Sequence, residues 1–360
     1  MSQQSTQPDV LEESTIIDTD VHVSIHPEEL ATNLETPHDS RVRNKFCFPR
    51  YAGSDYDPSL GGKIEGRLLM KPEQIDDTLR GEFHIDHPLL NPLLSICRLP
   101  DPDFAVELMR ANNSAFVEKF LDQTDAPGLP LITTQRPDKA AEEIDRLADE
   151  DQVVGVLLQS TGPDRPLGNP SYDIIYEAAE DNGLPVVFHA AAATAFKYDF
   201  MKQAQGLNQF LEVHTLAHLW SQTLTLTSLL VEGVPEKFSD LDFVFLEAGI
   251  GWVPYMMWRL NKEYSIRRSE APLLQKSPEE YVREQFYFAS QPLGEPNDAQ
   301  QMKEMIDLVS IDNMMFASDY PHWDFDHPNE LDKHLKTHFS AEEREQVLEE
   351  NPAEVFDLKV

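Results

Sequence analysis

Two short runs of the sequence combine apolar, strand-forming residues with carboxylate and imidazole side chains. In the first run, Asp18, Asp20 and His22 occupy alternate positions among β-branched residues. Alternate residues of a strand point to the same side, so the pattern predicts three ionisable groups on one face of a buried strand. Because buried charges are costly without a partner, we interpret this face as a ligand site rather than as ordinary core.

The second run ends in Asp319. The apolar residues 314–317 lead into this aspartate, and Pro321 then breaks any strand or helix. This order predicts a buried strand that delivers a carboxylate to its carboxyl end, where ligands and catalytic groups collect in α/β folds. The alternative is an aspartate that only caps the turn before Pro321.

Other predicted strands end in residues of the same chemical type. His189 follows the fifth strand and Glu247 follows the sixth. Imidazole and carboxylate groups that converge from separate strand ends can hold a catalytic metal, because rigid elements fix them while water or substrate takes an open position. The candidate donors for such a centre are Asp20, His22, His189, Glu247 and Asp319.

Two further histidines belong to one long predicted helix. Residues 208–232 contain few helix breakers, and His214 and His218 lie four residues apart, so they share a face. Histidines at this spacing can bind a metal, but no glutamate between them completes an HExxH motif. We therefore expect this pair to face the substrate, as lid histidines with a catalytic role, or simply to pack.

The elements that must position these groups alternate between apolar strands and amphipathic helices. The eight predicted strands are 15–23, 84–90, 129–134, 153–159, 184–190, 242–248, 286–291 and 314–319. Helices are predicted over 102–124, 137–149, 170–182 and 298–308. Eight strands in this arrangement fit a closed (β/α)8 TIM barrel.

The remaining segments are interpreted as additions to one barrel domain, residues 15–360. Residues 26–66 read as an irregular N-terminal insertion, a helical lid segment follows the fifth strand, and helices at 328–337 and 341–349 close the C-terminus. Residues 1–14 are polar and read as a disordered tail.

Composition restricts the class of partner. The chain has 64 acidic and 29 basic residues, a formal net charge of -35. Such a charge repels nucleic acid and anionic membranes, so we expect neither as a partner. The acidic residues are spread along the whole chain, which favours halophilic adaptation over an acidic binding tail. Two cysteines, no signal peptide and no membrane-length apolar segment predict a cytoplasmic protein.

Several motifs together resemble a known family. They are IIDTDVH at the first strand, VVFHA at 186–190, FLEAGIGWVPYMMWRLN at 245–261, FASDYPHWDFD at 316–326 and the closing ENPAEVFDL. In these motifs the chain resembles the amidohydrolase-related (amidohydrolase 2) branch of the metal-dependent amidohydrolase superfamily. That branch includes the aminocarboxymuconate-semialdehyde decarboxylase-like enzymes, and the resemblance runs from about residue 15 to residue 358.

The resemblance implies a barrel with a divalent metal at the carboxyl-end mouth, and ligand positions at His22, His189 and Asp319. The usual His-x-His motif is here Asp20-x-His22, so Asp20 is expected as the fourth ligand, and Glu247 stands where relatives often have histidine. We expect zinc, with iron or manganese as alternatives because carboxylates make the site harder. Strand four ends at Gln159, without a lysine for a bridging carbamate, which favours one ion per chain, with a second ion recruited by Glu247 as the alternative.

The reaction expected first is hydrolysis of an ester-, amide- or thioester-like carbonyl in a small-molecule substrate. Asp319 would take a proton from an activated water, and Glu247 or a lid histidine would protonate the leaving group. Non-oxidative decarboxylation of an aromatic or unsaturated acid is the alternative, and a non-catalytic metal-binding barrel is a third. The predicted substrate contacts are Trp323, His322 and Gln291, and the family often forms homodimers.

A decarboxylase would want a cationic residue near the mouth to hold a second carboxylate. Arg50, Arg98 and Arg259 are available in the sequence, although their direction is open. Arg259 lies in the helix after the GWVP stretch, and we expect it to pair with an acidic neighbour instead.

Overall fold

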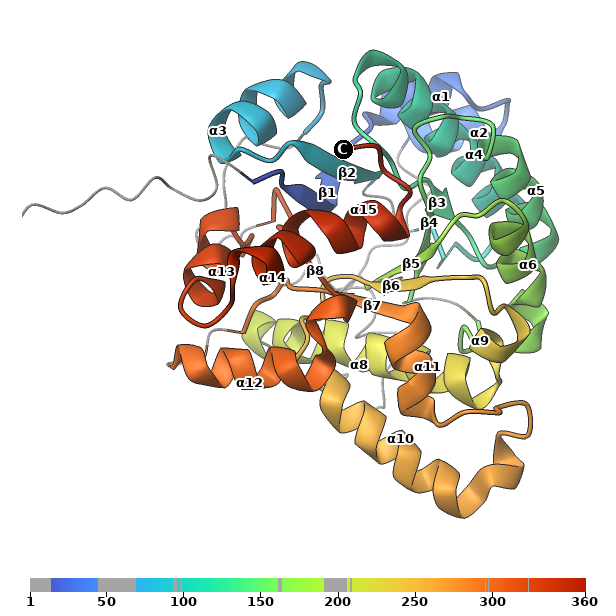
Figure 1. The fold of residues 1–360 in the computed structure, drawn as a ribbon. Helices are drawn as coiled ribbons and strands as arrows, with labels where there is room; N and C mark the ends of the chain where they lie inside the picture. Colours follow the sequence, from blue (N-terminus) through green and yellow to red (C-terminus); the bar gives the residue numbers. More distant parts are fainter. Residues whose placement is uncertain are drawn as a thin grey trace, which may run out of the picture.

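A computed structural model describes most of the chain. The described residues are 14–44, 69–92, 96–97, 99–160, 164–190, 206–207, 209–294, 296, 298–322 and 324–360. The predicted tail, apart from Ser14, lies outside these ranges, as do residues 45–66 of the predicted insertion and residues 191–205 of the predicted lid segment. Strands lie at the centre of the molecule and helices surround them (Figure 1).

Eight parallel strands follow the predicted order. They are β1 Ile17–Val23, β2 His87–Pro92, β3 Leu131–Ile132, β4 Val156–Gln159, β5 Val186–His189, β6 Phe243–Phe245, β7 Phe286–Ala289 and β8 Met314–Met315. Strands β3 to β8 form one six-stranded sheet in sequence order, and β1 pairs with β2. Bridges between Leu90 and Gly128 and between Val21 and Tyr320 join the two sheets at both edges. The ring is therefore closed, as the predicted (β/α)8 barrel requires.

Most strands are shorter than predicted because the chain leaves the regular ladder near the mouth of the barrel. After β8, irregular hydrogen bonds replace ladder pairing with β1: Thr19 N donates to Phe316 O, and His22 N donates to Tyr320 O. The strand residues are buried almost without exception, as parallel strands covered on both faces must be. The regular strands thus end, and irregular backbone begins, near the candidate functional side chains.

Helices cover the outside of the strands. The longer ones are α4 Pro102–Lys119, α5 Pro137–Leu147, α6 Asp173–Asp181, α8 Phe210–Val231, α10 Val253–Arg267, α11 Pro278–Gln285, α12 Ala299–Val309 and α13 Pro328–Leu335. Several begin with proline in the first turn behind a capping side chain; Asp101, for example, accepts a hydrogen bond from Phe104 N before α4. Helix α13 and the C-terminal helix α14 Ala341–Glu345 agree with the closing helices predicted at 328–337 and 341–349, whereas α15 Asn351–Val355 was not predicted.

The part of the predicted irregular insertion that the structure describes is instead partly helical. Helices α1 Pro27–Thr32 and α2 His38–Arg43 lie there. His26 caps α1 through Nδ1, which accepts from Glu28 N, while the carboxylate of Glu29 accepts from His26 N. Histidine is an unusual residue for such a capping box, which is why the helix start was missed.

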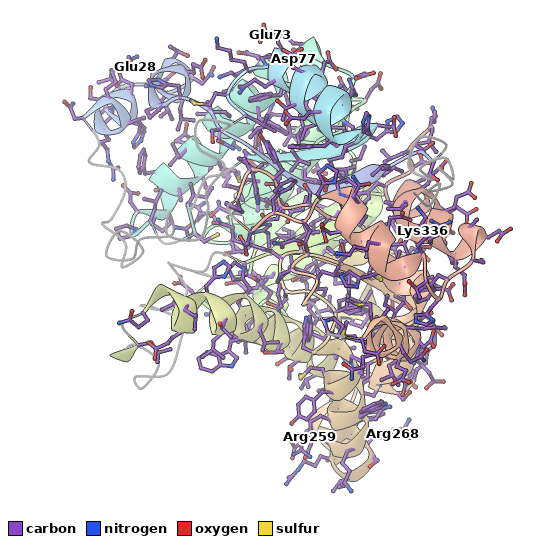
Figure 2. The ribbon with its side chains drawn as sticks, turned by 90° about the vertical axis from the view of Figure 1, so that its left-hand side faces the viewer. Glu28, Glu73, Asp77, Arg259, Arg268 and Lys336 are labelled. Atoms are coloured by element: carbon purple, nitrogen blue, oxygen red, sulfur yellow. The ribbon has the colours of Figure 1, made fainter. Side chains whose placement is uncertain are left out.

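Charged side chains project from the outer helices. In Figure 2, Glu28, Glu73 and Asp77 lie at one end of the molecule, and Arg259 in α10 and Arg268 just after this helix lie at the opposite end. Arg259 pairs with Glu263, as expected. In the described part of the chain, no helix is long and apolar enough to cross a membrane.

Candidate metal centre

Strand β1 presents Asp20 and His22 at the mouth of the barrel, and both side chains are fully buried. Asn91, at the end of β2, fixes the pair. His22 Nδ1 donates to Asn91 Oδ1, and Asn91 Nδ2 donates to Asp20 Oδ1 over 2.6 Å. Consequently His22 Nε2 and Asp20 Oδ2 are the atoms left to bind a ligand, which is how outer contacts orient metal-binding histidines.

Asp319 enters the same space from the loop after β8. Its backbone has φ 62°, a left-handed conformation that aspartate tolerates better than most residues, and its N–H donates to Asp20 O. Asp18 Oδ1 accepts from Ser318 N at 2.9 Å and from Asp20 N at 3.1 Å, so it ties the loop to β1. Asp18, which the sequence placed on the ligand face, therefore acts as an anchor.

The carboxylate of Asp319 lies between two histidines. Its Oδ1 is 2.9 Å from His22 Nε2 and 2.5 Å from His322 Nδ1, while its Oδ2 is buried without a hydrogen bond. His322 thus contacts Asp319 rather than standing apart as a substrate contact only.

His189 and Glu247 complete this side of the mouth. His189 Nε2, at the end of β5, is 3.5 Å from Asp20 Oδ2 and 3.3 Å from Glu247 Oε2. Glu247, just after β6, has φ 53°. A glutamate held in the left-handed region is strained, and such strain is concentrated at functional sites.

The four residues Asp20, His22, His189 and Asp319 fit a cation. Each offers a ligand atom, and these atoms all lie within 4.8 Å of one another. Asp20 Oδ2, Asp319 Oδ2 and His189 Nε2 are buried without hydrogen bonds. Buried polar atoms normally have partners, so three unsatisfied atoms that converge on one space indicate a ligand between them. These four residues are called the first site below.

The carboxylates of the first site shift the pKa values of the histidines that contact them. Burial alone would lower the pKa of His189, but the charges of Asp20 and Glu247 raise it to about 9. Burial alone would likewise lower the pKa of His322, but the carboxylate of Asp319 raises this pKa to about 10. Burial would raise the pKa of Asp319, but His322 and His22 hold it below its usual range. The carboxylates thus draw positive charge into the mouth.

A second group of donors adjoins the first. His218, on α8, places Nδ1 3.0 Å from Glu247 Oε2, and His214 places Nε2 3.7 Å from Asp324 Oδ2. The structure therefore brings the two predicted lid histidines to the mouth. Burial, with the nearby charges of Asp319 and Glu247, raises the pKa of Asp324 to about 6.

The other predicted contacts divide into two sets. Gln291 is buried after β7, and its Nε2 donates to Asp324 O at 3.3 Å, so it lies beside the second group. Trp323, Arg50 and Arg98 lie outside the described residues. Sequence reasoning missed Asn91 and Asp324. The position of Asn91 after the second apolar strand was the available signal, and Asp324 is part of the quoted motif at 316–326.

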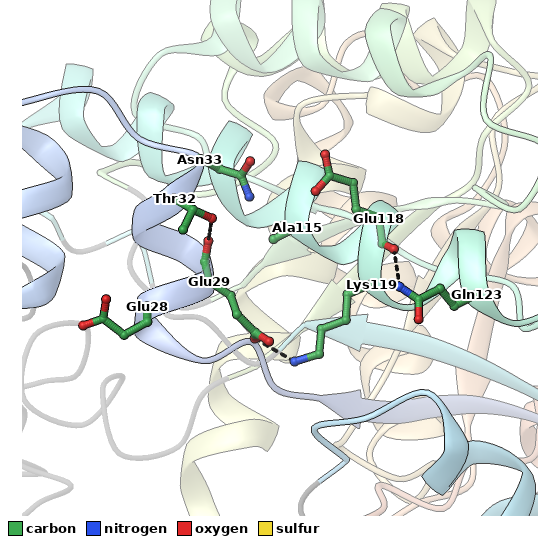
Figure 3. Close-up of a pocket in the computed structure, with 8 residues that line it drawn as sticks. All are labelled: Glu28, Glu29, Thr32, Asn33, Ala115, Glu118, Lys119 and Gln123. Atoms are coloured by element: carbon green, nitrogen blue, oxygen red, sulfur yellow. Dashed lines mark hydrogen bonds and ion pairs between the residues drawn. The ribbon is translucent and has the colours of Figure 1, made fainter.

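A surface pocket of about 450 Å³ lies elsewhere, between α1 and α4 (Figure 3). The lysine of its lining is already paired, because Lys119 Nζ is 2.7 Å from Glu29 Oε2. It shares no residue with the donor groups at the mouth of the barrel. We therefore assign the chemistry to the barrel mouth.

Comparison with known proteins agrees with this architecture. The sequence model of the family described as Amidohydrolase matches residues 17–358. Gamma-resorcylate decarboxylase from Polaromonas sp. is 23% identical over 275 residues, covering 72% of this chain and 79% of the relative.

Two solved structures illustrate the shared fold. An amidohydrolase from Mycobacterium avium subsp. paratuberculosis superposes with a TM-score of 0.74 at 17% identity, over 96% of this chain and 99% of the other. 5-Carboxyvanillate decarboxylase from Novosphingobium aromaticivorans, complexed with manganese and 4-hydroxy-3-methoxy-5-nitrobenzoic acid, superposes with a TM-score of 0.71 at 19% identity, over 99% and 100%.

Proposed function

This chain is a member of the amidohydrolase family and an enzyme, and from that premise we propose that it is a metal-dependent decarboxylase of a hydroxylated aromatic carboxylic acid. Its relatives named above include a gamma-resorcylate decarboxylase and a 5-carboxyvanillate decarboxylase. These relatives favour the decarboxylase alternative over the hydrolysis that the sequence led us to expect first.

The proposed cofactor is one divalent ion in the first site, held by Asp20, His22, His189 and Asp319. Bound there, such an ion would attract the carboxylate and hydroxyl oxygens of an acidic substrate and would stabilise negative charge on them. A set of two carboxylates and two imidazoles suits manganese or iron as well as zinc. Because the 5-carboxyvanillate decarboxylase structure contains manganese, we propose manganese rather than the zinc first expected.

One observation carries the choice of reaction: Asp319 contacts His322, whose Nδ1 lies 2.5 Å from Asp319 Oδ1. A protonated imidazole beside the central carboxylate is a proton reservoir, which suits adding a proton to carbon better than removing one from water. His322 is partly exposed, so it can recover a proton from solvent after each turnover. In this proposal Asp319 therefore relays the proton that His322 holds, whereas hydrolysis required Asp319 to be the base.

The proposed step moves one proton and one electron pair. The proton of His322 passes through Asp319 to the ring carbon that carries the carboxylate. The bond between that carbon and the carboxylate then breaks, its electron pair stays in the ring and restores aromaticity, and carbon dioxide leaves. The contact of His322 Nδ1 with Asp319 Oδ1 keeps the two groups aligned for this transfer.

The test uses hydroxybenzoic acids labelled with carbon-13 in the carboxyl group, incubated in heavy water with the manganese-loaded full-length protein. Release of labelled carbon dioxide, with one deuterium at the vacated ring position, is the expected result. A parallel panel of aryl esters, amides and thioesters tests hydrolysis. Turnover of that panel without any decarboxylation would refute the proposal.

A further inference from the structure

We propose that the chain binds a second divalent metal ion, held by His214, His218 and Glu247 next to the first site. These three residues are called the second site. Their ligand atoms lie within 4.8 Å of one another, the same spacing that defines the first site. A second ion goes beyond the proposed reaction. The ligand geometry is independent of the substrate, and only the charge balance rests on the anionic substrate of the proposed decarboxylase.

His218 is the residue that indicates a ligand. It is only 6% exposed, and neither of its ring nitrogens makes a hydrogen bond. Its Nδ1 lies 3.0 Å from Glu247 Oε2, close enough for both atoms to contact one ion. Nε2 of this buried imidazole has no polar partner and Nδ1 contacts Glu247 without a hydrogen bond, so a metal ion would satisfy the ring.

Helix α8 holds these histidines rigidly at the barrel. Gln222 is four residues beyond His218 and therefore on the same helix face. Its Nε2 donates to Phe188 O and to Leu246 O, both over 2.9 Å. These carbonyls immediately precede His189 and Glu247, so Gln222 fixes α8 against the two strand ends that carry donors.

Glu247 connects the two sites. Its Oε2 lies 3.0 Å from His218 Nδ1 in the second site and 3.3 Å from His189 Nε2 in the first. A carboxylate between two sets of donors is typical of two-metal centres, whose ions are about 3.5–4 Å apart. The glutamate therefore stands where a bridging ligand would be required.

The balance of charge favours a second cation. The mouth collects Asp20, Asp319, Glu247 and Asp324, and one divalent ion together with the protonated His322 of the proposed reaction would neutralise only three of these four carboxylates. The anionic substrate of a decarboxylase would then meet an excess of negative charge. A second divalent ion removes that excess, and Asp324 Oδ2, 3.7 Å from His214 Nε2, lies within reach of it.

Two imidazoles and a carboxylate identify the class of ion. Nitrogen and oxygen donors in this ratio bind zinc, manganese or iron and are poor sites for calcium or magnesium. His214 is partly exposed, with 22% of its side-chain surface accessible, which leaves the second site open to solvent on one side. An ion can therefore enter without unfolding the barrel.

The test measures metal content and coupling in the full-length protein, stripped with chelator, reloaded with excess manganese and then desalted. Wild-type protein is expected to retain two ions per chain, with the broadened electron paramagnetic resonance spectrum of two coupled ions. His218→Ala and His218→Gln should retain one ion and give an uncoupled spectrum. His334→Ala is the matched control, because His334 also lies in a helix but in none of the donor groups.

Two outcomes would overturn the second site. One is a wild-type protein that saturates at a single ion per chain, which decides the question even if the variants do not fold. The other is a folded His218→Ala protein, by circular dichroism, that still retains two coupled ions. The variant His22→Ala should lose the first ion and the coupling while keeping one ion, so failure of one site is distinguishable from failure of the other.

Discussion

Replacing Asn91 by alanine should weaken metal binding without touching a metal ligand. Asn91 Oδ1 accepts from His22 Nδ1, and Asn91 Nδ2 donates to Asp20 Oδ1 over 2.6 Å, so one amide orients two proposed ligands. Loss of such outer contacts typically costs about 10–100-fold in metal affinity. That range corresponds to about 1.4–2.7 kcal/mol of binding free energy.

The assay is a competition titration of manganese between the stripped protein and a fluorescent chelator. Asn113→Ala is the matched control, because Asn113 is equally buried and its Nδ2 donates to Leu131 O and Glu143 Oε1, away from the donor groups. Both variants should lose about 1–3 kcal/mol of folding stability from unsatisfied partners. Only Asn91→Ala should lose affinity, and an unchanged dissociation constant in a folded Asn91→Ala protein would refute the reasoning.

Three further predictions concern Asp319, the two histidines with raised pKa values and the net charge. Asp319→Asn should lower turnover by at least about 10²-fold, because asparagine cannot pass a proton. The melting temperature should change little, because asparagine tolerates the φ of 62°. Full activity in a kinetic assay would exclude the proposed role of Asp319 in proton transfer. In metal-free protein the pKa of His189 is raised to about 9 and that of His322 to about 10, from the usual 6.5. The protonated histidines therefore contribute their full stability below pH 6.5, and this stability is lost as the pH rises through 9 and 10. Calorimetry should therefore show the melting temperature of the metal-free protein falling between pH 6.5 and 10, and a constant melting temperature there would contradict the assignment. The net charge of -35 predicts that the melting temperature rises when potassium chloride is raised from about 0.1 to about 1 M. The added salt shortens the screening length from about 10 to about 3 Å and so weakens the repulsion between acidic residues. Full stability in dilute buffer would argue against halophilic adaptation.

The sequence was sufficient to predict the order of the barrel and much of the candidate site. Strands buried on both faces leave an apolar signature, and Asp20, His22, His189 and Asp319 interrupt or end such runs. Residues at the carboxyl ends of parallel strands must meet at one mouth, so their convergence followed from topology alone. The structure brings these four together within 4.8 Å.

The contacts that arise between distant elements were beyond the sequence. The spacing of His214 and His218 predicted a shared helix face, but nothing local showed that Glu247 would meet that face. Asn91 is uncharged and lies one residue past the predicted end of the second strand, so no ionisable group marked it. Its role depends on the parallel register that sets it opposite His22.

The first site is tested most directly by anomalous X-ray scattering from crystals of the manganese-loaded protein. The account predicts a manganese peak bounded by Asp20, His22, His189 and Asp319, and its loss in His189→Ala crystals. A map in which these four side chains are ordered but enclose no peak, or a peak that is unchanged in His189→Ala, would contradict it.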